Sequence, residues 1–189
     1  MTVVYAAAGV ILLVAAWLIA SYRGLASVAA DSERAWHAMD AQLRRRHDLV
    51  PALVAAVREH APGESVAVER LVAACTDAGS AETPFARGEA ERRLVAALGT
   101  VAALAERHTS LAGTGPFVTL QAQLATIEDE IQAARRIYNA EVRLYLSRRN
   151  GFPASLMTGL TEFPERPYFE LDHTRHGAGL RLTTPAEAA

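Results

Sequence analysis

The chain contains no lysine and a single cysteine, and aromatic residues make up only 6% of its 189 residues. Because Cys75 has no possible partner within the chain, the fold does not depend on an internal disulfide. The 19 basic residues, all arginine, nearly balance 21 acidic residues, which argues against an electrostatic nucleic-acid binder. Few aromatic residues with many alanines and leucines favour helix over sheet.

The signatures of several enzyme classes are also missing. The sequence has no Gly-rich phosphate loop, no Cys-x-x-Cys and no recognisable pair of catalytic carboxylates. Asp172, His173 and His176 could supply metal ligands, but the surrounding tail shows neither helical periodicity nor capping, and a fortuitous cluster is the preferred interpretation. We therefore expect no catalytic residue, no cofactor and no metal site.

A long uncharged segment opens the chain. Residues 2–22 carry no charge, and as a helix they would reach roughly 30 Å, the thickness of the hydrocarbon layer of a bilayer. Residues 1–25 are therefore predicted to form a transmembrane anchor. A cleaved signal peptide is the alternative, since residues 27–29 have the small-x-small form of a cleavage site, but no basic region precedes the apolar run.

The basic residues nearest the apolar segment follow it. Arg23 and Arg34 lie just after the span, and only Met1 and Thr2 precede the apolar run. The positive-inside rule then predicts a short N-terminus outside and a cytoplasmic domain after the anchor.

Residues 26–171 are predicted to form an all-α domain. Breaks containing glycine or proline separate four amphipathic helical segments, and no convincing strand is present. These features predict an up-and-down antiparallel four-helix bundle whose first helix continues from the anchor, with a coiled-coil-like seam on the last helix. Residues 172–189 are predicted to be a flexible tail, whereas the aromatic residues between 152 and 171 are expected to pack on the bundle. The four helical segments are 26–60, 64–77, 84–111 and the stretch from the break at 112–116 to residue 150.

Polar residues interrupt the apolar face of the first helix. Arg46 occupies the position between Leu43 and Val50 where a core residue is due, so its charge requires a partner. Pro51 removes a backbone donor within the same helix and predicts a kink. Asp48, three residues before the proline, could accept hydrogen bonds from backbone donors freed there.

On the last helix, Glu128, Arg135 and Asn139 lie on or beside the apolar seam. Two interpretations cover these residues together with Arg46 and Asp48: a buried ion-pair and amide network that sets helix register, or a groove that binds a partner. The network is preferred because buried pairs most often specify packing. His37 and His47 are likewise interpreted as surface or network residues.

Trp36 lies near the membrane in sequence. It is interpreted as a core aromatic residue at the base of the bundle, with docking of a membrane-embedded partner as the alternative.

These motifs, in this order and spacing, resemble the LemA family. The resemblance covers about residues 1–171 and implies a bacterial inner-membrane protein with an outward N-terminus, a cytoplasmic helical bundle and no established enzymatic activity. The chain has Ala52 and Leu146 where the family usually carries asparagine. The matching residues are Ala35-Trp36, Asp40-x-Gln42-Leu43-x-Arg45-Arg46-x-Asp48-Leu49-x-Pro51-x-Leu53-Val54, Leu120-Gln121, Glu128, Ile131, Ala134-Arg135, Tyr138-Asn139, Phe152-Pro153 and Tyr168-Phe169-Glu170.

The leading functional hypothesis is a non-enzymatic single-pass membrane protein whose bundle is a scaffold or adaptor. Its expected partners are the lipid bilayer and other membrane or membrane-associated proteins, with no nucleic acid. One alternative is a membrane-tethered metal-dependent hydrolase or other enzyme that uses the carboxylates and the tail histidines. Another is a self-assembling membrane organiser, a homo-oligomer in which small residues such as Ala16 and Ala20 pack between protomers.

Overall fold

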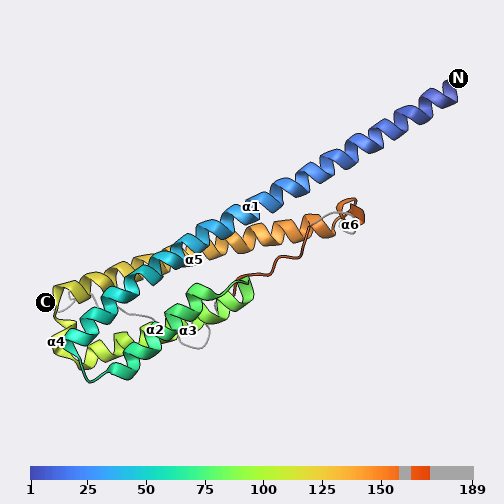
Figure 1. The fold of residues 1–189 in the computed structure, drawn as a ribbon. Coiled ribbons are helices and arrows are strands. Elements are labelled where there is room, and N and C mark those ends of the chain that lie inside the picture. The colour runs from blue at the N-terminus through green and yellow to red at the C-terminus, as the bar shows by residue number, and fades with distance from the viewer. Residues whose placement is uncertain (158–162, 171–189) are drawn as a thin grey trace. The chain divides into compact units, whose positions relative to one another are not determined.

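The computed structural model describes residues 1–157 and 163–170, and all of the regular secondary structure assigned there is helical (Figure 1). The predicted all-α class is confirmed. The predicted tail and the possible metal ligands Asp172, His173 and His176 lie outside the described residues. The helices are α1 (Thr2–His60), α2 (Ser65–Ser80), α3 (Pro84–Arg107), α4 (Thr109–Ala112), α5 (Gly115–Asn150) and α6 (Ala154–Met157).

Local sequence signals set several helix ends. α1 ends at His60, just before Pro62 and Gly63, and α5 ends at Asn150, next to Gly151, as predicted. Thr83 caps α3, because its side-chain oxygen accepts a hydrogen bond of 3.2 Å from the backbone N–H of Ala86, and proline occupies the first helical position.

Two helix ends differ from the predicted ones because of tertiary packing. α2 continues to Ser80, beyond the predicted end at residue 77, because Ala78 is buried in the core and extends the packed face. The third helix ends at Arg107 and not near residue 111. His108 adopts an extended conformation there, and the separate helix α4 then places Leu111 in the core.

α1 continues through Pro51 as one assigned helix. Proline cannot donate to the carbonyl of His47, four residues earlier. That carbonyl instead accepts a hydrogen bond of 4.0 Å from the thiol of Cys75 on α2. Asp48, which was expected to accept from freed backbone donors, is exposed and makes no such hydrogen bond within the described residues. A thiol from another helix thus takes the place of the missing backbone donor.

The chain divides into two compact units. Unit 1 comprises Met1–Asp40 and Ala134–Tyr168, and Leu25, Val28, Tyr145 and Ala154 form a buried cluster in it. Unit 2 comprises Ala41–Ala133 together with Phe169 and Glu170 of the described residues. Its core joins parts of α1 to α5 through buried side chains that include Val57, Leu71, Leu94, Leu111 and Phe117.

The first part of α1, within unit 1, has no core of its own. An 18-residue window has a mean hydropathy of 2.5, and none of its residues is buried. Figure 1 shows this blue end of α1 with no other helix beside it. By length and composition, α1 can therefore cross a membrane.

Candidate functional site

Four charged or titratable side chains of unit 2 meet around Arg46, and we call Arg46, His47, Glu91 and Glu128 the charged cluster. Arg46 is only 1% exposed and comes from the apolar face of α1. Its guanidinium donates one hydrogen bond of 2.5 Å to Glu91 on α3 and another of 2.7 Å to Glu128 on α5. Arg46, whose charge was expected to require a partner, therefore has two, and together these hydrogen bonds link three helices.

Glu91 lies at the centre of the charged cluster and is completely buried. One carboxylate oxygen accepts from Arg46, and the other lies 2.8 Å from Nε2 of His47. Burial by itself raises the pKa of Glu91, but the hydrogen bond with His47 and the charge of Arg46 outweigh burial. The pKa of Glu91 is therefore lower than its ordinary value, and the carboxylate form is favoured.

Sequence reasoning did not identify Glu91, although a signal for it exists. Leu94, Leu98 and Val101 follow a helical repeat on α3, and extending the repeat backwards places Glu91 and Arg87 on the same face. This is the argument that singled out Arg46 on α1. A charge at a core position, found on two helices, indicates a buried pair.

Arg87 is the second buried charge on α3. Its guanidinium donates to the backbone carbonyls of Ala78 and Gly79, the latter at 3.3 Å, near the C-terminal end of α2. The last carbonyls of a helix lack intrahelical donors and carry partial negative charge, so a cation there stabilises the end of the helix. Arg87 therefore has a structural role.

The other predicted site residues do not belong to the charged cluster. Asp48 and Pro51 are exposed on α1 in unit 2. Trp36, Arg135 and Asn139 are half-buried residues of unit 1, and the indole of Trp36 packs on the ring of Tyr138 with centroids 5.4 Å apart. Trp36 was expected to be a core residue, and in the structure it is half-buried with one face on Tyr138.

A groove of about 500 Å³ lies beside the charged cluster in unit 2. Its lining mixes charged, hydroxyl, amide and aliphatic groups, as the surfaces of transient protein interfaces do. Arg45, at one edge, pairs with Glu130 at 2.6 Å. The lining residues are Arg45, Asp48 and Leu49 of α1, and Thr119, Ala122, Gln123, Thr126 and Ile127 of α5.

In unit 1, buried tyrosines hold the extended segment 163–168 against α5. The hydroxyl of Tyr138 donates to the carbonyl of Pro167 at 3.0 Å, and that of Tyr145 donates to the carbonyl of Pro164 at 2.8 Å. Burial raises the pKa of both tyrosines, which keeps the phenols protonated as donors. The prediction that the aromatic residues of this region pack on the helices holds for Phe163 and Phe169, whereas Phe152 is 73% exposed.

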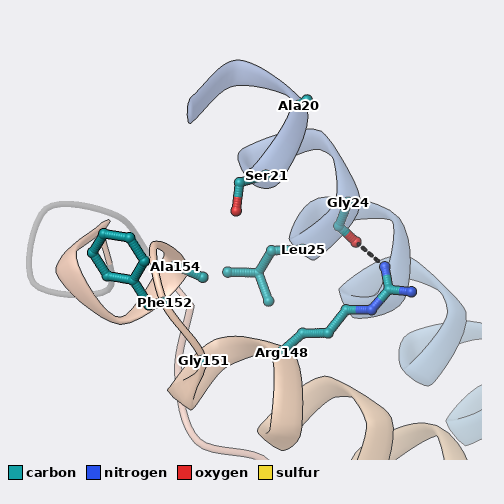
Figure 2. Close-up of a pocket in the computed structure, with 8 residues that line it drawn as sticks. All are labelled: Ala20, Ser21, Gly24, Leu25, Arg148, Gly151, Phe152 and Ala154. Atoms are coloured by element: carbon teal, nitrogen blue, oxygen red, sulfur yellow. Dashed lines mark hydrogen bonds between the residues drawn. The ribbon is translucent and has the colours of Figure 1, made fainter. Parts of the chain in front are cut away.

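A pocket of about 290 Å³ lies in unit 1, where α1 faces the turn between α5 and α6 (Figure 2). Arg148 donates to the carbonyl of Gly24 at 3.4 Å across this pocket. The pocket is lined by Ala20, Ser21, Gly24, Leu25, Arg148, Gly151, Phe152 and Ala154.

Comparison with known protein families identifies the chain. The family model of the LemA family matches residues 35–178, well over half of the sequence. The chain belongs to the LemA family. The match includes Arg46, Glu91 and Glu128, and it begins after the apolar segment of α1. No curated protein matches this LemA-family chain.

Membership of the family gives no information on catalysis, so the chemistry available to this chain has to be inferred from the residues of the site. Both oxygens of Glu91 and both terminal nitrogens of Arg46 are engaged within the charged cluster. Among residues 1–157 and 163–170, no group of three or more His, Cys, Asp or Glu side chains could hold a metal ion. The geometry of the charged cluster is that of a buried polar network joining helices.

Proposed function

We propose that this LemA-family protein is a non-enzymatic, single-pass membrane protein whose cytoplasmic helical domain serves as a scaffold or adaptor for partner proteins. The observation that carries the proposal is the first part of α1, a strongly apolar stretch of helix with no buried residue. An exposed apolar helix of this length is unfavourable in water and is stabilised in a bilayer. The same helix then supplies Leu53 and Val57 to the core of unit 2, so that anchor and domain share one helix.

A four-helix arrangement is part of the proposal. Within unit 2, α1, α2, α3 and α5 contribute to a single core, which supports antiparallel bundle packing of these helices. The charged cluster spans three of the four helices, and its directional hydrogen bonds favour one register among the alternatives that apolar contacts alone would permit.

The non-enzymatic part of the proposal is supported by how the polar groups are used. Arg46 and Glu91 are nearly inaccessible to solvent, and their hydrogen-bonding atoms face each other. A catalytic group needs to reach a substrate, and a carboxylate with both oxygens engaged inside a core is poorly placed for that role. The inner membrane and the cytoplasmic side of the domain are part of the proposal, and the arginines after the span support the cytoplasmic side.

The groove of unit 2 is the proposed partner surface. It presents Asp48 and Gln123 to solvent beside the apolar side chains of Leu49 and Ile127. Such a mixture suits a transient protein contact, in which apolar area supplies affinity and polar groups supply selectivity.

The test is crosslinking in living cells with a photoreactive amino acid placed at position 48 or 123. Matched controls carry the same probe at Glu69 or Arg70, which are exposed on α2 outside the groove. We expect a defined membrane-associated protein to be captured from the groove and not from α2. Capture of the protein itself alone would favour self-assembly through residues such as Ala16 and Ala20, and turnover dependent on Arg46 or Glu128 would overturn the non-enzymatic assignment.

A further inference from the structure

An aromatic residue at the turn between α5 and α6 is left unusually exposed. Phe152 is 73% exposed, yet its ring packs on the indole of Trp17, itself 47% exposed, with centroids 5.4 Å apart. Both aromatic side chains keep much of their apolar surface uncovered. Exposed aromatic surface of this kind, continuous with a long apolar helix, is typical of a site that contacts a membrane or the apolar surface of another protein.

The position of Trp17 sets the depth at which Phe152 lies. Trp17 is five residues before Tyr22, the last residue of the uncharged segment, and the helical rise places it about 7.5 Å deeper along α1. Aromatic residues at that depth lie at the boundary between headgroups and acyl chains. If α1 spans the membrane as proposed above, then Phe152, which packs on Trp17, reaches the same boundary from α5.

Basic side chains lie on the solvent side of these aromatic residues. Arg148 is exposed, and its hydrogen bond to the carbonyl of Gly24 is long at 3.4 Å, so most of its five donors are available. Arg23 is also exposed, but it does not line the pocket. Within the described residues neither arginine forms an ion pair with a carboxylate, whereas the neighbouring Arg149 pairs with Glu165. Arg148 thus gives the pocket a positive charge, and Arg23 adds a second positive charge to α1 just after the uncharged segment.

The pocket beside Arg148 offers further polar groups. In Figure 2 the hydroxyl of Ser21 points toward the turn that carries Phe152 and Ala154, and the guanidinium of Arg148 approaches from the end of α5. The planar guanidinium of an arginine can bind phosphate oxygens, because its fork of donors matches the geometry of phosphate.

We propose that the α5–α6 turn is a second membrane contact, in which Phe152 inserts beside Trp17 and Arg148 binds the phosphate of anionic phospholipids. The inference rests on the proposed anchor, because that anchor places the bilayer beside Phe152. A basic residue close to an anionic membrane surface strengthens binding about fivefold. The contact would hold the end of α5 at the membrane surface.

The experiment uses the full chain in lipid nanodiscs and measures quenching of a single indole by brominated lipids. Trp17→Phe and Trp36→Phe remove the two native indoles, and Phe152→Trp then reports on the turn. The matched control, in the same background, is Phe85→Trp on α3, because Phe85 is 74% exposed and belongs to unit 2. We expect strong quenching at position 152 in discs rich in phosphatidylglycerol and weak quenching at position 85.

The role of Arg148 is tested by varying the lipid charge. Arg148→Gln is expected to raise about fivefold the phosphatidylglycerol content needed for half-maximal quenching at position 152. Arg143→Gln, an equally exposed change on the same helix away from the pocket, should have little effect.

Three outcomes would overturn the proposal or the anchor on which it rests. Absence of quenching at position 152, while the native indole of Trp17 in a Trp36→Phe variant is quenched, would refute the second contact and leave the anchor intact. Equal quenching in phosphatidylcholine discs, insensitive to Arg148→Gln, would refute binding of anionic lipid. No quenching of Trp17 would refute the anchor itself.

Discussion

In unit 1, Tyr138 and Tyr145 bury neutral phenols whose hydroxyls donate to backbone carbonyls, whereas in unit 2 Arg46 and Glu91 bury full charges. Both solutions satisfy polar groups, but they differ in what happens when one partner is lost. A phenol that is removed leaves an unpaired carbonyl, while an arginine that is removed leaves a buried carboxylate without its main counter-charge. Unit 2 should therefore be far more sensitive than unit 1 to single changes in its polar network.

The largest expected effect is that of Arg46→Ala. The change removes the counter-charge of Glu91 in the core and is expected to destabilise unit 2 by about 3 to 5 kcal/mol. Hydrogen exchange measured peptide by peptide in nanodiscs should show faster exchange across residues 41–133. The combined variant Arg46→Met with Glu91→Leu removes both charges of the buried pair. It should therefore recover much of the stability that Arg46→Ala loses. A loss no larger than 1 kcal/mol for Arg46→Ala would contradict the importance of the buried charge.

Acid should act on the same unit with a smaller effect. The folded pKa of Glu91 is below its ordinary value of 4.5, so its contribution to stability is present above pH 4.5 and is lost as pH falls through the folded pKa. The loss should be smaller than for Arg46→Ala, because Arg46 keeps its hydrogen bond with Glu128. Urea unfolding as a function of pH checks this, and Glu91→Gln should flatten the acid dependence.

The tyrosines of unit 1 should respond at the opposite end of the pH scale. Their folded pKa values lie above the ordinary value of 10.0, so their contribution to stability is intact below pH 10 and declines as pH rises toward the folded pKa.

Tyr145→Phe removes only a neutral hydrogen bond and should lower the stability of unit 1 by about 1 kcal/mol. Hydrogen exchange of α5 residues 134–150 would measure this loss of stability. A loss as large as that caused by Arg46→Ala would contradict the contrast between the units.

The smallest expected effect belongs to an exposed pair next to the charged cluster. Arg45 and Glu130 are joined at 2.6 Å, but both side chains are solvated, and such pairs contribute about 0 to 1 kcal/mol. Arg45→Ala should therefore leave the urea midpoint almost unchanged. Any remaining shift of the midpoint should become smaller at high salt, which screens the exposed pair. Since Arg45 and Arg46 are neighbours on one helix, the two substitutions isolate burial as the cause of the difference.

Much of the fold could be predicted from the sequence, and the failures have physical causes. The start of α3 at Thr83 and Pro84 was predictable, because a cap depends on residues within one turn. The end of α3 was not, since the break at His108 serves the burial of Leu111 in the core. Arg46 was identified from its position on an apolar face, but Glu91 was missed even though the same rule applies to α3.

The helical class, most helix ends and a segment long enough to span a bilayer follow from the sequence by itself. These features arise from caps, breakers and periodicity, which act over a few neighbouring residues. Only the tertiary structure decided that Arg46 pairs with Glu91 as well as Glu128, that Cys75 serves the carbonyl freed by Pro51, and that Phe152 lies on Trp17. These contacts join residues on different helices, and they depend on how whole faces pack, which no local pattern specifies.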